Sequence, residues 1–524
     1  MLVPALLVLF SNWTFFSKVA DVYPWTEGNA GFLLSLALFH YSLLVLIMLI
    51  FSLLLPARIV ASILIILTAV VGYFSDHMGV IIDADMIGTM FETNVAEATD
   101  LLNFGFIMHV VLAGLTPAVL MWLVPMQKSG TLNELRYKAQ TAVAAIAAMV
   151  ISVLPLGDHY ASFLREHKPL RSYMHPTASI LYFGQYIKHE IIASKNHPFV
   201  SLAGNLKRTD VYSHPELIIM VVGETARADH FSLNGYKRKT NPKLELEKNL
   251  ISYSNISSCG TLTAISVPCM FSHGGRENFD KGTAYYIENV LDLLQRSGVS
   301  VLWRDNNSDS KGVADRVTYE NFQSPKINHE CDIECRDTGM LQGLQDYIDR
   351  QQGDILIVLH SMGSHGPAYF KRYPREFERF TPACNTLELS QCSNAEIINA
   401  YDNTILYTDH FLSKAIELLK HNTPKYETAM FYVSDHGESL GESGIYLHGM
   451  PYIIAPDAQI KVPIITWASS SSDIDIKRSI ELRDVKNSHD AVFNTLLTLF
   501  EIQSDLSPST AGPLVYLVDE TKAH

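Results

Sequence analysis

The sequence predicts a protein in two parts: an α-helical membrane domain with five transmembrane helices, followed by a soluble α/β domain. Leu, Ile, Val, Ala and Phe dominate residues 1–157, in stretches long enough to cross a bilayer. From residue 215 onward, runs typical of strands alternate with helical patterns, which indicates a parallel sheet covered by helices. The predicted domains are a membrane domain at 1–157, an amphipathic interfacial linker at 158–210 and a soluble domain at 211–524.

Five apolar stretches account for the membrane domain, near 2–19, 31–55, 58–75, 105–124 and 139–157. A membrane helix needs roughly 20 apolar residues, and four of the stretches meet that length. The first stretch is short and contains Asn12 and Trp13, so a cleaved signal peptide is an alternative there. Because it lacks a basic n-region and a clear small-residue cleavage site, the sequence favours a helix.

The loop charges predict how the chain crosses the membrane. The loop at 125–138 carries Lys128, Arg136 and Lys138, whereas the loop at 76–104 carries acidic residues and neither Lys nor Arg. The positive-inside rule then places the N-terminus in the cytoplasm, and five crossings place residues 158–524 outside it. Basic and aromatic side chains alternate with apolar ones along 158–210, which is typical of a segment at the membrane interface. A solvated connector is the alternative.

Cysteine usage and net charge restrict which compartment and which partners the soluble part can have. All six cysteines lie in the soluble part: Cys259, Cys269, Cys331, Cys335, Cys384 and Cys392. An even number so placed favours disulfides and an oxidising compartment over a C-x₃-C metal site at 331–335, which would need further thiols nearby. A net charge of −14 argues against nucleic acid as a partner.

We expect the functional residues of the soluble part to lie at one edge of a sheet. Expected strands are 217–222, 298–303, 354–359, 429–433 and 461–467, and expected helices are 283–297, 338–352 and 395–421. In parallel α/β folds, ligands bind at the carboxyl ends of the strands. Glu224, His360, Asp435 and His436 each follow a strand directly, so we expect them to converge.

These residue types suit metal-dependent transfer of a phosphoryl group. Glu224, Asp435 and His436 are ligands suited to zinc, and Thr263 offers a hydroxyl that could attack phosphorus. Each residue also has an ordinary structural interpretation, as a capping group, a turn or a surface carboxylate. Glu438 and Glu442 lie in a loop-like run and are expected to be solvated.

Several motifs together resemble those of one enzyme family. They are E-T-x-R at 224–227, N-G-Y at 234–236, S-C-G-T-x-T-A-x-S-V-P-C-M-F-S at 258–272, H-x-M-G-S-H-G-P at 360–367, Y-D-N-T at 401–404 and S-D-H-G-E-S-L-G-E at 434–442. The whole chain resembles the phosphoethanolamine transferases of Gram-negative bacteria, and most of all the lipid A branch that includes the mobile colistin-resistance enzymes. The resemblance implies a catalytic domain with the alkaline-phosphatase/sulfatase fold behind a five-helix membrane module.

The resemblance also implies roles for single residues. Zinc would be held by Glu224, Asp435, His436 and the nucleophile Thr263. The implied substrate contacts are His360, His365, His448, Lys311, Thr93 and Glu97, with a second zinc possible at His365 and His448. The implied disulfides are 259–269, 331–335 and 384–392.

The expected activity follows from that family. It is transfer of phosphoethanolamine from phosphatidylethanolamine to a lipid A phosphate of lipopolysaccharide, through a phosphothreonine, with resistance to polymyxin and cationic peptides as the result. The expected location is the bacterial inner membrane, with the catalytic domain in the periplasm. Alternatives are transfer to Kdo or core heptose, a phosphoglycerol transferase or hydrolase of the same fold, and a non-catalytic binding module.

Overall fold

The computed structural model describes residues 2–93, 95–125, 130–188, 198–202, 205–208, 214–506 and 511–518. The chain divides into two compact units. The membrane unit comprises Met1–Phe91 and Leu101–Lys188, and the α/β unit comprises Glu92–Asp100 and His189–His524. The short segment 92–100 therefore belongs to the α/β unit, although the sequence on both sides of it belongs to the membrane unit.

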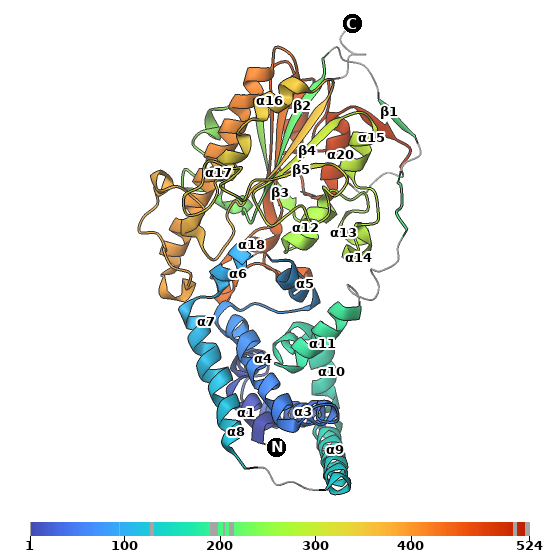
Figure 1. The fold of residues 1–524 in the computed structure, drawn as a ribbon, viewed down its shortest axis with the longest axis vertical. Coiled ribbons are helices and arrows are strands. Elements are labelled where there is room, and N and C mark those ends of the chain that lie inside the picture. The colour runs from blue at the N-terminus through green and yellow to red at the C-terminus, as the bar shows by residue number, and fades with distance from the viewer. Residues whose placement is uncertain are drawn as a thin grey trace. The chain divides into compact units, whose positions relative to one another are not determined.

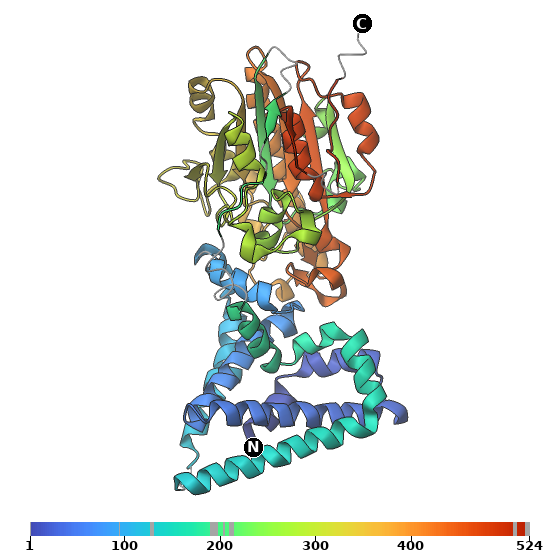
Figure 2. The same cartoon turned by 90° about the vertical axis from the view of Figure 1, so that its right-hand side faces the viewer.

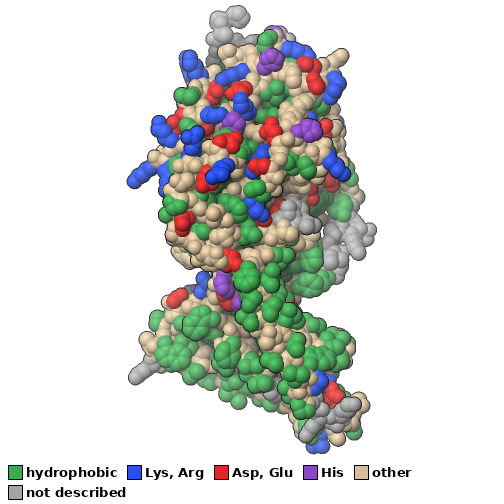
Figure 3. All heavy atoms as spheres, turned by 60° about the vertical axis from the view of Figure 1, so that its left-hand side comes forward, with side chains coloured by type: hydrophobic (Ala, Val, Ile, Leu, Met, Phe, Trp, Pro, Cys, Tyr) green, Lys and Arg blue, Asp and Glu red, His purple; other side chains and the backbone are tan. Residues whose placement is uncertain are grey.

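The membrane unit is helical and apolar on its outside. Its main helices are α1 (Leu2–Phe10), α2 (Trp13–Val22), α3 (Glu27–Phe51), α4 (Ala57–Met78), α5 (Ala84–Glu92, whose last residue falls in the α/β unit), α7 (Phe104–His109), α8 (Thr116–Leu123), α9 (Thr131–Val153), α10 (Gly157–Glu166) and α11 (Thr177–Tyr186). Figure 2 shows α3 and α9 as the longest of them. Large hydrophobic side chains are exposed along most of these helices, and Figure 3 shows them as a nearly continuous apolar surface.

The predicted membrane spans are present, with two differences. Among the described residues, four helices are long and apolar enough to cross a membrane, and five if α1 and α2 are counted as one span. These two helices meet at 57° around Asn12, whose amide donates to the carbonyl of Leu7, so the first stretch is a broken helix. In addition, α9 begins at Thr131, inside the predicted loop 125–138, of which residues 126–129 lie outside the described part.

The α/β unit is built on an eight-stranded sheet with the order β11-β3-β10-β7-β2-β6-β4-β5. The strands are β2 (Glu216–Gly223), β3 (Leu250–Ser257), β4 (Ser300–Asp305), β5 (Thr318–Asn321), β6 (Ile355–His360), β7 (Glu427–Ser434), β10 (Lys461–Ala468) and β11 (Asn487–Ser488). Figure 1 shows α16 (Leu344–Arg350) and α17 (Asn394–Asn422) on one side of the sheet, and α12 (Thr263–Met270), α15 (Val290–Arg296) and α20 (Asp490–Leu499) on the other. All five expected strands are present, and α17 confirms the expected helix at 395–421.

The sheet is mixed, so the expectation of a parallel sheet is wrong for one side of it. β10 runs antiparallel to both β7 and β3, whereas β2, β4, β5, β6 and β7 are parallel. The chain returns from β7 to β10 through residues 435–460, which contain no long crossover helix of the kind that a parallel connection requires. The apolar run of β10 gave no indication of its direction, because a strand buried on both faces reads the same either way.

Two expected helices are shorter than the sequence suggested. The stretch 283–297 becomes α15 only from Val290, because Asn289 and Asp292 form a capping box that starts the helix there. The stretch 338–352 becomes a 3₁₀ turn at Asp337–Leu341 and then α16. Gly343, at φ 67°, separates the two in a conformation that favours glycine.

Alternate residues of the central strands pack on opposite sides of the sheet. Along β2, Ile218, Met220 and Val222 join the core beneath α15 and α20, and Leu217, Ile219 and Val221 join the core beneath α17. This burial on both faces explains the continuous apolar runs by which the sequence revealed these strands. Because β2 pairs in parallel with both β6 and β7, the carboxyl ends of these three strands lie at one edge of the sheet.

The opposite edge of the sheet carries a buried group of carboxyl side chains. Glu216 and Glu427 are register partners at the first positions of β2 and β7, and Asp473 lies within 4.8 Å of both, oxygen to oxygen. Burial and the neighbouring carboxylates raise the pKa of Glu216 to about 10 and that of Asp473 to about 7. These side chains therefore stay protonated at a pH where the unfolded chain is ionised.

We predict that Glu216→Gln stabilises the protein, and more so at pH 8 than at pH 5. The pKa of Glu216 is higher in the folded state than its ordinary 4.5, so its contribution to stability is lost as the pH rises from about 4.5 towards 10. Removing that ionisation should raise the free energy of unfolding by about 1–3 kcal/mol at pH 8. Thermal unfolding at both pH values measures this change in stability, and Glu481→Gln, at an exposed position, is the control. An equal shift at both pH values would contradict the prediction.

Candidate active site

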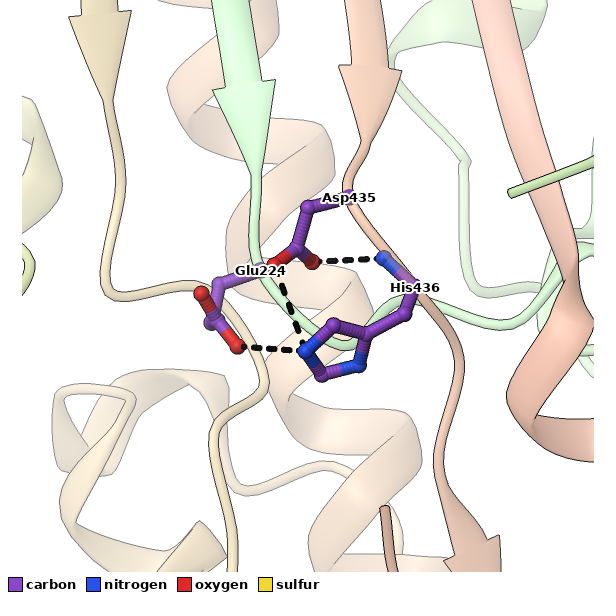
Figure 4. Close-up of side chains that lie close together, drawn as sticks. All are labelled: Glu224, Asp435 and His436. Atoms are coloured by element: carbon purple, nitrogen blue, oxygen red, sulfur yellow. Dashed lines mark hydrogen bonds and ion pairs between the residues drawn. The ribbon is translucent and has the colours of Figure 1, made fainter. Parts of the chain in front are cut away.

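Three buried side chains that could bind a metal ion meet at the carboxyl edge of the sheet. Glu224 follows β2, and Asp435 and His436 follow β7; all three are at most 1% exposed. The two strands are parallel neighbours with Gly223 opposite Ser434, so their ends deliver the three side chains to one point (Figure 4). The structure thus brings together three of the four residues that the sequence predicted to converge, and His360 is the exception.

Thr263 completes a four-atom cluster. Its hydroxyl oxygen lies 3.3 Å from both carboxylate oxygens of Glu224 and 3.3 Å from Nε2 of His436. That same Nε2 is 3.5 Å from Oε1 of Glu224 and 3.2 Å from Oδ2 of Asp435. Ligands arranged as a tetrahedron about 2.0–2.1 Å from zinc are about 3.3–3.4 Å from one another. The spacing of the cluster therefore fits a tetrahedral zinc ion.

The hydrogen bonds around the cluster leave its ligand atoms available to a metal. Oδ1 of Asp435 accepts the backbone N–H groups of Thr225 and His436, while its buried Oδ2 has no hydrogen-bond partner among the described residues. Nδ1 of His436 lies 3.0 Å from the carbonyl of Gly437 and donates to it, so Nε2 carries the lone pair. A buried carboxylate oxygen and an imidazole lone pair that face the same point are the donor set of a zinc site.

The electrostatics of the cluster also call for a cation. Burial and the adjacent Asp435 raise the pKa of Glu224 well above its ordinary value. Burial lowers the pKa of His436 to about 4, so this imidazole is neutral near pH 7. Two buried carboxylates beside a neutral imidazole are unfavourable unless a positive ion compensates their charge.

Thr263 is placed by the helix that it begins. It is the first residue of α12, where the positive end of the helix dipole favours negative charge on its oxygen. Ser266, one turn further on, donates to the carbonyl of Asp435 at 2.5 Å. His489 bridges the same two elements, since Nδ1 accepts from the backbone N–H of Cys259 and Nε2 donates to the carbonyl of Ser434. The helix that carries Thr263 is thus fixed to the loop that carries the metal ligands.

Asn307 is a site residue that the sequence reasoning missed. Its amide donates to Oε2 of Glu224 at 2.8 Å and to the carbonyl of Ser361 at 2.9 Å, which orients the Glu224 carboxylate. Gly363 lies so close to Glu224 that a Cβ atom there would meet the Glu224 carbonyl oxygen at 2.7 Å. Asn307 follows β4 closely. The rule that ligands bind at the carboxyl ends of the strands, which identified Glu224, could therefore have identified Asn307 as well.

His360 lies at the same edge of the sheet but not in the cluster. It ends β6, is fully buried, and places Nδ1 at 2.9 Å from Oδ2 of Asp305. Among the described residues, no hydrogen-bond partner is found for its Nε2. Its role as a substrate contact remains a prediction.

His365 and His448 lie beside the metal cluster. The ring of His448 is 4.3 Å from that of His436 and 5.4 Å from that of His365, centroid to centroid. Nδ1 of His448 lies 2.7 Å from Oε2 of Glu438, whose other oxygen accepts the hydroxyl of Tyr369. Burial lowers the pKa of His448 to about 3 and raises that of Glu438 to about 7.

The expectation that Glu438 is solvated is therefore wrong. It is fully buried against His448 and Tyr369, and burial brings it into the site. Glu442, at 48% side-chain exposure, is partly solvated and forms an ion pair with Arg227 of the E-T-x-R motif. The two glutamates look alike in a polar loop sequence, but Glu438 directly precedes β8 (Ser439–Leu440) and Glu442 lies in the turn between β8 and β9 (Tyr446–Leu447).

The remaining predicted contacts lie further out. Lys311 is buried in the loop after β4, where Nζ donates to the carbonyl of Ser308 and pairs with Asp309, and neither of these contacts joins it to the cluster. Thr93 and Glu97 lie in segment 92–100 of the α/β unit. Burial and Asp435 raise the pKa of Glu224 most, and the negative charge of Glu97 contributes to the same shift.

Three disulfides support the loops around the site. They join Cys259 to Cys269, Cys331 to Cys335 and Cys384 to Cys392, which are the pairs that the family resemblance implied. The first of them spans the loop before α12 and the helix itself, so it constrains the segment that presents Thr263.

Comparison with known proteins matches both units. The family model described as Sulfatase matches residues 216–502, and that of the phosphoethanolamine transferases EptA/EptB matches residues 40–191. The chain is 42% identical to phosphatidylethanolamine transferase Mcr-1 of Escherichia coli, over 96% of this chain and 94% of that protein. The chain belongs to the phosphoethanolamine transferase family. It is therefore an enzyme that transfers phosphoethanolamine, with a membrane-embedded helical unit and a sulfatase-type α/β unit.

Solved structures agree with this assignment. The integral membrane lipooligosaccharide phosphoethanolamine transferase A of Neisseria meningitidis matches this transferase with a TM-score of 0.90 and 31% identity, over 96% of each chain. The C-terminal periplasmic domain of phosphoethanolamine transferase EptC of Campylobacter jejuni matches with a TM-score of 0.53 and 44% identity, over 59% of this chain and 94% of that one.

We predict that Asn307→Ala weakens metal binding by about 10- to 100-fold, because it removes the donor that orients Glu224. Zinc affinity measured by competition with a chelator tests this prediction. The matched control is Asn255→Ala, which removes an amide that accepts from Lys461 on β10 instead. If the two variants bind zinc equally well, Asn307 does not support the metal site.

Proposed function

We propose that this protein transfers phosphoethanolamine from phosphatidylethanolamine to a lipid A phosphate, through a phosphothreonine formed at Thr263 in a zinc site. One observation carries the proposal: the Thr263 hydroxyl, at the start of α12, lies 3.3 Å from ligand atoms of Glu224 and His436. Oxygen and nitrogen ligands at tetrahedral spacing favour zinc over magnesium or calcium, which take more ligands and prefer oxygen alone.

The zinc ligands would be Glu224, Asp435, His436 and Thr263. Zinc held there would lower the pKa of the threonine hydroxyl and offset negative charge on the phosphoryl oxygens of the substrate. The chain's own groups support the same chemistry, since Asn307 orients Glu224 and α12 directs its positive end at the Thr263 oxygen.

The proposed transfer takes two steps with Thr263 as the covalent carrier. In the first step the Thr263 oxygen bonds to the phosphorus of phosphatidylethanolamine, the phosphorus–oxygen bond to the glycerol breaks, and diacylglycerol leaves with a proton. In the second step an oxygen of the acceptor phosphate bonds to that phosphorus, the bond to Thr263 breaks, and the Thr263 oxygen takes up a proton, which restores the hydroxyl. His365 and His448, beside the cluster, are the candidates for moving the proton at the leaving oxygen, and a second zinc between them is an alternative role.

Relatives support the choice of donor and acceptor. Mcr-1 carries phosphatidylethanolamine transferase in its name and is 42% identical to this chain, which supports that lipid as the donor. The Kdo(2)-lipid A phosphoethanolamine 7''-transferase of E. coli is only 28% identical, over 79% of this chain, which favours lipid A phosphate ahead of Kdo as the acceptor. Masking that phosphate with an amine would weaken the binding of polymyxin and cationic peptides.

The proposed location is the inner membrane, with the α/β unit in the periplasm. Three disulfides fit an oxidising compartment, and the loop charges orient the helices accordingly. The part of the C. jejuni relative that matches the α/β unit is its C-terminal periplasmic domain, which supports the same location here.

We predict a phosphoethanolamine mass increment on lipid A from cells that express the wild-type protein and none from cells that express Thr263→Ala. The substitution removes the attacking oxygen and leaves Glu224, Asp435 and His436 in place, so zinc content should largely persist. Mass spectrometry of lipid A and metal analysis of the purified proteins provide the two measurements.

Other outcomes would change the proposal in defined ways. An increment on core oligosaccharide but not on lipid A would move the acceptor and keep the chemistry. A phosphoglycerol increment would identify a different donor. An increment that persists in Thr263→Ala would contradict a phosphothreonine at this position, and no increment with either protein would favour a hydrolase.

A further inference from the structure

The edge of the sheet opposite the candidate active site holds a second group of side chains that could bind a metal ion. Glu216 begins β2, Glu427 begins β7, and Asp473 lies in the loop after β10. Because β10 runs antiparallel to β7, the loop after β10 lies at the edge where β2 and β7 begin. One carboxylate oxygen from each of the three residues lies within 4.8 Å of the other two. We call these three residues the carboxylate triad.

The backbone around Asp473 holds the triad in place. The N–H of Asp473 donates to Oε2 of Glu427 at 3.1 Å, and its carbonyl accepts from the N–H of Val518 at 2.8 Å. At the start of the same loop, the N–H of Ser469 donates to the carbonyl of Thr428 on β7 at 2.9 Å. The loop is thus fixed to β7, and the position of the Asp473 side chain relative to Glu427 is fixed with it.

Asp473 supplies the observation that favours a bound ligand. It is 8% exposed, and its Oδ2 is buried with no hydrogen-bond partner among the described residues. Glu216 and Glu427 are buried to a similar degree, at 4% and 6% exposure. A buried carboxylate oxygen without a partner is unfavourable unless a donor or a cation compensates it. A cation shared by the three carboxylates would give Oδ2 of Asp473 that partner.

The surroundings of the triad are acidic. Arg208 lies at the same edge and forms an ion pair there with Oδ2 of Asp354, whose Oδ1 accepts from the N–H of Glu216. Burial is the first cause that raises the pKa of Glu216 to about 10, and the others are the carboxylates of Asp473, Glu427, Asp354 and Glu501. So many acidic groups in a buried place favour a cation, because it allows them to ionise together.

We infer that the carboxylate triad of Glu216, Glu427 and Asp473 binds a calcium ion, separate from the zinc of the proposed function. Calcium takes oxygen ligands at about 2.3–2.6 Å, so oxygens on opposite sides of the ion are about 4.6–5.2 Å apart. The oxygens of the triad lie within that span. A donor set of carboxylates alone suits calcium or magnesium better than zinc. Magnesium keeps several water ligands, for which a buried triad leaves little room.

A calcium ion there would connect the beginnings of β2 and β7 to the loop after β10. Glu224 follows β2, and Asp435 and His436 follow β7, so the strands that begin at the triad end at the candidate zinc ligands. At about 3.3 Å per residue, Glu216 and Glu224 are about 26 Å apart. The ion would stabilise the sheet and take no part in the transfer reaction. The inference therefore does not depend on the proposed function.

The test measures calcium binding to the full-length protein in detergent at pH 8 with zinc present. Equilibrium dialysis with radioactive calcium should show one ion per chain for the wild type and binding at least about 10-fold weaker for Asp473→Asn, which keeps the size of the side chain. Calcium at 1 mM should raise the Tm of the wild type by about 3 °C, as for a ligand at about 100 times its Kd. The matched control Glu481→Gln, at an exposed position, should retain both effects.

Two further variants assign the calcium effect to the triad. Glu216→Gln should lose the calcium-dependent rise in Tm, because it removes one charged ligand. The stability gain predicted above for this substitution applies to the protein without calcium, and it should shrink when calcium is added. Asp435→Asn, which changes a candidate zinc ligand at the other edge of the sheet, should lower the zinc content and keep the calcium-dependent rise.

Three results would overturn the inference. The first is that the wild type binds no calcium. The second is a calcium-dependent rise in Tm that persists in both Asp473→Asn and Glu216→Gln, which would place the ion elsewhere. The third is loss of that rise in Asp435→Asn, which would place calcium at the zinc ligands. An equal rise with 1 mM magnesium would refute the choice of calcium. If Asp473→Asn does not fold, Glu216→Gln decides the question alone.

Discussion

The α/β unit is organised around one electrostatic constraint: side-chain oxygens of Glu224, Asp435 and Thr263 lie 3.2–3.5 Å from Nε2 of His436 in a buried site. Carboxylates so placed repel one another, and Oδ2 of Asp435 has no hydrogen-bond partner in the described part of the chain to compensate its burial. A bound cation would resolve both problems and, in the proposed reaction, would also activate the adjacent hydroxyl. The feature that is unfavourable without a metal is thus the feature that the proposed reaction would use.

The surrounding structure holds that arrangement through contacts from distant parts of the sequence. Tyr401 of α17 donates its hydroxyl to the carbonyl of Thr225, which has a left-handed φ of 51° directly after Glu224. His489, far along the chain, ties Cys259 to Ser434 on the opposite side of the cluster. A non-glycine residue with positive φ persists only where neighbouring contacts enforce it. The backbone beside the site is therefore held in place by α17 and by the region before α20, and not by the two strands alone.

Much of this site could be predicted from the sequence. The parts that could not be predicted have one physical reason in common. Glu224, Asp435 and His436 follow apolar strands, and the end of such a strand can be recognised in the sequence because the apolar run stops there. Glu438 was expected in solvent because its burial depends on contacts with Tyr369 and His448, which a polar loop sequence does not reveal. The direction of β10 could not be predicted either, because the same apolar run is compatible with parallel and with antiparallel pairing. The attachment of segment 92–100 through Asp100 depends on Arg372, 272 residues away, and no local pattern encodes such a contact.

The balance of charge around the site bears on which donor the enzyme can use. Glu224 and Asp435 supply negative charge at the cluster and Glu97 adds to it, since its charge contributes to raising the pKa of Glu224, and zinc would neutralise only the two carboxylates that bind it. The negative charge that remains is unfavourable to an anionic phosphodiester unless the substrate brings its own positive charge. An ethanolamine head group supplies that charge, and a glycerol head group does not. The same acidic surroundings that require a metal therefore favour phosphoethanolamine over phosphoglycerol as the group transferred.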